Sequence, residues 1–156
     1  MDTLNIKREA AIAAHKNAKT SGKKLLEDLL GKETFTDIRD LIEDFSDVCE
    51  IMGKAELDYT CNSNDPDDIA ACALKQALLI ARCYNQNRKG KIDWTDHNQP
   101  KYCHRYIYNS ASGWSLFVVV RWAASSYCGS RLYFIDSDDA KDAWEKFSHI
   151  YINLIK

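Results

Sequence analysis

Residues 101–122, KYCHRYIYNSASGWSLFVVVRW, mark the point where the sequence changes from helical to strand-like patterns. Two runs rich in aromatic and β-branched residues, KYCHRYIY and WSLFVVVRW, flank the loop NSASG. Such runs on either side of a short glycine-containing loop are typical of an antiparallel hairpin. We expect SRLYFI, residues 130–135, to add a third strand to the same sheet.

The segments on both sides of these strands have helical patterns. The acidic run at residues 136–139 precedes an apolar stripe that continues to Ile155, which predicts a C-terminal helix covering the sheet. Upstream, we expect helices over residues 4–19 and 23–30, separated at Gly22, and a third up to Met52 that restarts near Ser46. A fourth begins at Pro66 with Asp65 as its N-cap. The fold class is therefore α+β: N-terminal helices, then a three-stranded antiparallel sheet covered by a C-terminal helix.

The length favours a single domain over residues 1–156. Within it, residues 1–22 form a candidate helical arm, 32–87 a helical part, and 101–156 the β-β-β-α part. The apolar face of the arm is mostly alanine, so we expect it to pack on a partner or on another copy of the chain.

The composition restricts the classes of function. A net charge of −2 gives no general attraction to nucleic acid or membranes, and no apolar run reaches the ~18 residues of a spanning helix. The N-terminus lacks the apolar segment of a signal peptide. Six cysteines lack zinc-site spacing and are expected to be reduced, mostly buried thiols of a cytoplasmic protein. We expect no catalytic residues, metal or cofactor, and no membrane association.

Residues 101–134 contain no acidic residue. They carry a formal charge of +4, which leaves the rest of the chain at −6, and they hold nine of the 17 aromatic residues. Strand alternation places one apolar face against the C-terminal helix: Trp114, Leu116, Val118, Val120, Trp122, Leu132 and Phe134. The opposite face of the second and third strands would carry four candidate binding residues: Phe117, Arg121, Arg131 and Tyr133. Arg105 on the first strand is a further candidate.

Two interpretations of this basic, aromatic face remain open. Aspartate and glutamate are poor strand formers, so the composition can follow from β-propensity alone, with the N-terminal helices covering that face. Alternatively, the face binds a partner, because aromatic rings stack on bases or apolar groups while arginines meet negative charge. In the binding case a protein partner is favoured over nucleic acid, since four positive charges are few.

The loop DWTDH is the best candidate for enzymatic chemistry. It places Asp93, Asp96 and His97 together, and a histidine beside carboxylates can act as a general base. Three polar residues before a strand also commonly form turns and caps. An enzyme using this loop is therefore the weakest of the three alternatives.

Four segments resemble, in order, a family of small, functionally uncharacterised proteins from Bacteroidetes genomes, prophages and phages. They are SGKKLLEDLLGKETF, FSDVCEIMG, IDWTDHNQPKY and GSRLYFIDSDDAKDAWEKFSHIY, and GSRLYF is the most specific. The resemblance implies a mobile-element context. We therefore expect a non-enzymatic accessory or regulatory protein that binds a protein partner, with single-stranded nucleic-acid binding as the alternative.

Overall fold

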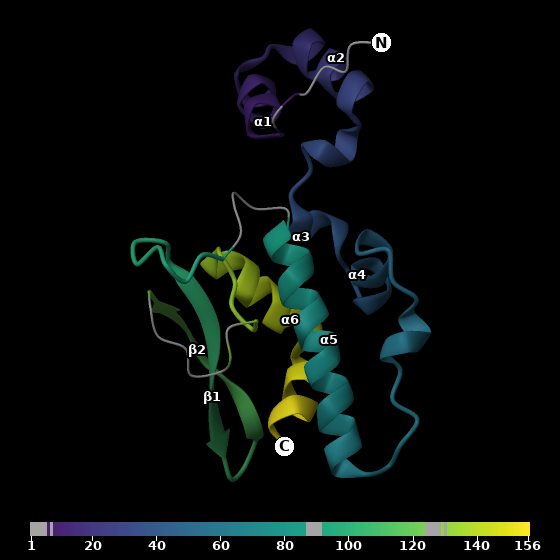
Figure 1. Ribbon diagram of the computed structural model, residues 1–156, viewed down its shortest axis with the longest axis vertical. Helices are drawn as coiled ribbons and strands as arrows, with labels where there is room; N and C mark the ends of the chain where they lie inside the picture. Colours follow the sequence, from purple (N-terminus) through teal and green to yellow (C-terminus); the bar gives the residue numbers. More distant parts are fainter. Residues whose placement is uncertain (1–5, 7, 87–91, 124–128, 130) are drawn as a thin grey trace. The chain divides into compact units, whose positions relative to one another are not determined.

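The chain divides into two compact units, residues 1–41 and 42–156. The computed structural model describes residues 6, 8–86, 92–123, 129 and 131–156 (Figure 1). Some residues covered by the sequence predictions lie outside these ranges. They are residues 4, 5 and 7 of the first expected helix, Ser130 of the expected third strand, and Cys128. The expectation of a single domain stays a prediction.

The described residues of the first unit form four short helices. They are α1 (Arg8–Asn17), α2 (Thr20–Leu30), the 3-10 helix η1 (Lys32–Thr34) and α3 (Ile38–Leu41). The His15 ring of α1 stacks on Phe35 with ring centroids 4.2 Å apart, and its Nε2 atom lies 2.7 Å from the Glu27 carboxylate. These contacts hold α1 against α2 and the segment that follows it.

The sequence predicts a break between the first two helices at Gly22, and this prediction is wrong. The break lies at Ala18 and Lys19, where Lys19 adopts an extended backbone and α2 begins at Thr20. Gly22 is inside α2, and a Cβ atom there would lie 3.1 Å from the Ala18 Cβ atom. The glycine therefore permits a close approach of the chain rather than a helix end.

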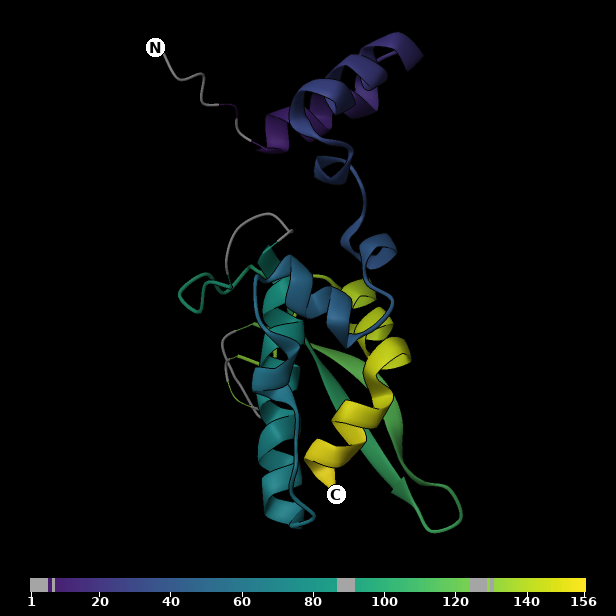
Figure 2. The same cartoon turned by 90° about the vertical axis from the view of Figure 1, so that its right-hand side faces the viewer.

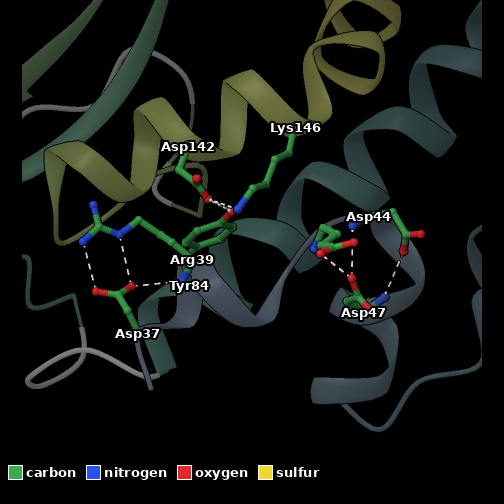
Figure 3. Close-up of polar contacts among 8 residues, drawn as sticks. Asp37, Arg39, Asp44, Asp47, Tyr84, Asp142 and Lys146 are labelled. Atoms are coloured by element: carbon green, nitrogen blue, oxygen red, sulfur yellow. Dashed lines mark hydrogen bonds and ion pairs between the residues drawn. The ribbon is translucent and has the colours of Figure 1, made fainter. Parts of the chain in front are cut away.

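The second unit begins with the helix α4 (Phe45–Ile51), and the expected restart near Ser46 is confirmed. Asp44 is its N-cap, and the Asp44 and Asp47 carboxylates accept each other's backbone N–H groups in a capping box (Figure 3). At the other end Gly53 has a φ of +60°, and the N–H of Lys54 donates to the carbonyl of Cys49. This is the Schellman arrangement that glycine favours.

The long helix α5 (Pro66–Gln86) follows the 3-10 helix η2 (Glu56–Tyr59). The Asp65 carboxylate accepts from the N–H groups of Asp67 and Asp68, which confirms the predicted cap. One side of α5 is buried against α4 and the C-terminal helix α6 (Ser137–Ile155). The buried residues are Ala73, Ala77, Leu79, Ile80, Ala81, Cys83 and Tyr84.

The predicted hairpin is confirmed: β1 (Lys101–Asn109) pairs antiparallel with β2 (Gly113–Trp122). The predicted third strand is wrong, because the sheet has two strands. Among the described residues of the expected third strand, only Phe134 pairs with β1, through two backbone hydrogen bonds with Tyr102. On its other side this segment bonds to the Asn85 side chain, which donates to the Tyr133 carbonyl and accepts from the Ile135 N–H. A side chain of α5 thus occupies the place of a further strand.

The helix α6 begins after Asp136, whose carboxylate accepts from the Asp138 N–H, as the sequence predicts. Figure 1 shows α6 between α5 and the hairpin, and Figure 2 shows α5 and α6 side by side. The core of this unit therefore lies on both sides of α6, and it includes the fully buried Phe134 and Phe147. In the described part of the chain, no helix combines the length and apolar character needed to cross a membrane.

Candidate interaction surface

The strand β2 carries one extra residue in the middle of the hairpin. Arg105 lies opposite Val118, but the next residue, Tyr106, lies opposite Leu116, so Phe117 has no partner across the ladder. Such a β-bulge shifts the alternation of side chains along the strand that contains it. The faces assigned from a period of two are consequently correct on only one side of Phe117.

The bulge divides the apolar face that the sequence predicts. Directly opposed residues of an antiparallel pair point to the same face of the sheet. Leu116 therefore shares a face with Tyr106, whereas Val118 shares the other face with Arg105. The prediction that Leu116, Val118 and Trp122 lie on one face is wrong, because it assumes an unbroken alternation.

One face of the hairpin is held against α6 by aromatic contacts. The His104 ring lies 4.6 Å from the Tyr151 ring and 6.1 Å from the Trp144 ring, measured between centroids. Tyr106 is 5.7 Å from Trp144 by the same measure. The His104 Nε2 atom also bonds to the Ala140 carbonyl. These contacts anchor the hairpin along its first strand.

The opposite face is covered at one end and open at the other. Lys101 and Cys103 are buried there, and the Lys101 ammonium donates to the carbonyls of Asp96 and Gln99. Toward the hairpin loop the side chains are exposed: Ile107 by 46%, Phe117 by 58% and Val118 by 40%. The exposed Arg105 guanidinium lies 5.5 Å from the centre of the Phe117 ring. We call Arg105, Ile107, Phe117 and Val118 the tip patch.

The five candidate residues from the sequence do not form one surface. Arg105 of β1 and Phe117 of β2 come together in the tip patch. Arg121 is exposed but lies opposite Tyr102, on the other face of the hairpin. Arg131 is exposed in a turn outside the sheet.

Tyr133 is fully buried, which corrects its assignment to a binding face. Its ring meets the Trp94 ring edge to face, with centroids 5.2 Å apart. Sequence reasoning also missed Ile107, which it did not name as a binding candidate, and Val118, which it placed on the face covered by the C-terminal helix. Their exposure depends on the register of the hairpin, for which the sequence contains no direct signal.

The Asp93–His97 loop uses its carboxylates locally. The Asp93 carboxylate accepts from the backbone N–H and the hydroxyl of Thr95, and these two bonds lower its pKa. The Asp96 carboxylate accepts from the Asn98 N–H. Both are the side-chain turns that aspartate commonly forms. Within the described ranges, no three histidine, cysteine or acidic side chains are grouped in a way that could hold a metal ion.

Comparison with known proteins adds no relative. No family model, no curated protein and no solved structure matches the chain.

Proposed function

We propose that this chain is a non-enzymatic accessory protein of a phage or integrated mobile element, and that it binds a protein partner through the tip patch in the host cytosol. The observation that carries the proposal is the exposed Phe117 at the bulge, with Arg105 against its ring and Ile107 and Val118 beside it. The mobile-element context rests on the family resemblance of the sequence.

The composition of the tip patch favours a protein interface. Aromatic residues and arginine are the residue types most enriched where proteins bind each other, and a central buried aromatic ring often carries much of the binding energy. Three large apolar side chains exposed on one small surface are unusual for a face that meets only water. The opposite face of the same hairpin is anchored to α6, so the patch is presented on a supported strand pair.

The charge of the region defines the chemistry of the partner. Residues 101–134 carry +4 and no carboxylate, so nothing in that stretch of sequence repels an acidic group. We therefore propose a partner surface with an apolar pocket for Phe117 and at least one carboxylate for Arg105. An Arg–carboxylate pair at the edge of an interface adds orientation and association rate more than affinity.

Single-stranded nucleic acid is the second candidate, favoured by the position of Arg105 over the exposed Phe117 ring. A base can stack on such a ring while the guanidinium meets a phosphate. The burial of Tyr133 removes one of the aromatic rings on which this alternative relied.

Site-specific photo-crosslinking distinguishes these candidates. A photoreactive phenylalanine analogue is placed at position 117, and in a matched variant at position 57, in cells that carry the gene. Leu57 is the control because it is a large apolar residue of the same unit, 79% exposed and located in η2 rather than in the hairpin. We expect a defined protein adduct from position 117 that position 57 does not give. Nucleic-acid adducts at 117 would favour the second candidate.

The captured protein is then purified and its affinity measured. Truncating a central aromatic residue at an interface commonly costs about 2 kcal/mol, so Phe117→Ser should weaken binding by roughly 30-fold. Leu57→Ser should leave the affinity unchanged. Equal effects of the two substitutions, or identical adducts from both positions, would contradict the proposal.

A further inference from the structure

Two cysteines lie together in an open pocket far along the chain from the tip patch. Cys61 follows η2, and Cys72 is in the second turn of α5. Both thiols are half-buried, and they line a pocket of about 430 Å³ together with Asn62, Ser63 and Asp68. The Cys61 thiol is one of the groups that raise the pKa of Cys72, after burial.

The segment that carries Cys61 is clamped onto α5 by three consecutive carbonyl groups. Lys75 donates to the carbonyl of Asp58, and the Gln76 amide donates to that of Tyr59 at 3.1 Å. The Cys72 thiol lies 3.9 Å from the carbonyl of Thr60, the residue just before Cys61. Because Cys72, Lys75 and Gln76 are on one side of α5, they fix the position of residue 61 opposite residue 72.

Aromatic packing adds to this clamp. Tyr59 is buried, and the Lys75 ammonium lies 4.8 Å from the centre of its ring. The backbone on which Cys61 sits is thus held by a core residue as well as by hydrogen bonds. A disulfide between residues 61 and 72 would therefore link two segments that these contacts already hold together.

We propose that Cys61 and Cys72 are a redox-sensitive pair that closes to a disulfide when the protein meets a low-molecular-weight disulfide such as oxidised glutathione. One cysteine thiolate attacks a sulfur of the reagent, forms a mixed disulfide and releases one reagent thiolate. The second cysteine thiolate attacks the protein sulfur of that mixed disulfide and displaces the second reagent thiolate. The two cysteines lose two protons and two electrons, and the reagent disulfide is reduced to two thiols.

The other described cysteines are unsuited to this reaction. Cys49, Cys83 and Cys103 are at most 3% exposed, so a reagent cannot reach them in the folded protein. Burial raises the pKa of Cys83 to about 12, which leaves almost no thiolate near neutral pH. The pKa of Cys72 is also raised, by burial first and then by Cys61, so closure should become faster as the pH rises above neutrality.

Mass spectrometry of native protein incubated with oxidised glutathione tests the proposal. Cleavage before aspartate separates the two cysteines, since Asp65, Asp67 and Asp68 lie between them. We expect a linked pair of peptides containing Cys61 and Cys72, and a protein mass reduced by two hydrogens. Urea-unfolded protein should show no preference for this pair among its six cysteines.

Two single substitutions complete the design. In Cys61→Ser and in Cys72→Ser the second step is impossible, so the remaining thiol should keep one glutathione as a stable adduct. The oxidised wild type should also melt at a higher temperature than either variant, because the link closes a ring of 12 residues, 61 to 72, in the unfolded chain. Two glutathiones on the wild-type pair, no reaction at all, or the same linkage pattern in native and unfolded protein would overturn the proposal.

Discussion

The Nε2 atom of His104 in β1 lies 2.6 Å from the carbonyl oxygen of Ala140 in α6. The Nδ1 atom of the same ring is 3.3 Å from the Tyr106 hydroxyl. A neutral imidazole satisfies both contacts, because one nitrogen donates to the carbonyl and the other accepts from the hydroxyl. The histidine thereby joins the hairpin to the helix on which the hairpin is anchored.

This arrangement predicts an acid-sensitive fold. Burial lowers the pKa of His104 from 6.5 to about 4, against a smaller opposing effect of the Ala140 bond. In the unfolded chain the His104 ring binds a proton below about pH 6.5, whereas in the folded chain it does so only below about pH 4. The free energy of unfolding therefore falls as the pH falls from 6.5 to 4. At roughly 1.4 kcal/mol per pKa unit the loss is about 3 kcal/mol. Urea unfolding at a series of pH values measures it.

His104→Gln is the matching variant, because glutamine retains a donor for the Ala140 carbonyl but does not titrate. Its free energy of unfolding should lack the part of the slope between pH 6.5 and 4 that belongs to residue 104. His97→Gln, at an exposed loop position, should keep the wild-type slope. The same slope in all three proteins would show that His104 is not held neutral.

A second prediction concerns the contact between α5 and α6 drawn in Figure 3. The Tyr84 hydroxyl donates to the Asp142 carboxylate at 2.6 Å, and Lys146 donates to the same oxygen at 2.9 Å. Burial raises the pKa of Tyr84 far above its usual value, so the hydroxyl stays protonated. Tyr84→Phe should cost about 1.5–3 kcal/mol of unfolding free energy, the range for a hydrogen bond to a charged group.

Lys146→Gln provides the comparison for Tyr84→Phe. The lysine and aspartate side chains of that ion pair are both about a fifth exposed, 24% and 19%. Water therefore screens the pair, and its loss should cost less than the loss of the tyrosine bond. If Tyr84→Phe unfolds at the wild-type urea concentration, the tyrosine bond contributes nothing to stability.

A third prediction tests the nucleic-acid alternative through Arg121 and Arg131. Both side chains are exposed, so Arg121→Glu plus Arg131→Glu should fold with little change in stability. Any binding of a single-stranded dT oligonucleotide by the wild type should fall with salt by a log–log slope of roughly −0.7 per phosphate. Arg105→Glu should lose this binding, whereas the double variant should only weaken it, because neither Arg121 nor Arg131 lies in the tip patch. The control reverses two exposed charges of the first unit, Lys16→Glu plus Lys24→Glu.

Two outcomes would be decisive in that experiment. The absence of salt-dependent binding by the wild type at low ionic strength would exclude the nucleic-acid alternative. Unfolding of the Arg121 and Arg131 double variant would show that the arginine stems pack in the protein interior.

A fourth prediction concerns residues 1–20 of the candidate arm. In α1 the apolar residues are mostly alanines, and Ala11 is buried while Ala10, Ala13 and Ala14 are exposed. Deleting residues 1–20 should therefore change oligomeric state or partner binding more than the melting of the 42–156 unit. Light scattering and calorimetry measure the two effects. A loss of several kcal/mol would identify α1 as a core element instead.

Local chemistry in the sequence determined where several elements begin. Asp65 before Pro66 set the start of α5, and Asp136 that of α6, because a carboxylate beside free N–H groups stabilises a helix start whatever surrounds it. The hairpin was equally predictable, since two β-branched, aromatic runs and a short loop are enough to define it.

The tertiary structure alone decided which residues face water. Three predictions failed. Among the described residues of the expected third strand, only Phe134 pairs with β1. Tyr133 is buried against Trp94, and the bulge at Phe117 exchanges the faces of β2. Each outcome depends on a contact between segments distant in the chain or on strand register. Side-chain period and local propensity carry no information about either, so the tip patch became visible only in the folded protein.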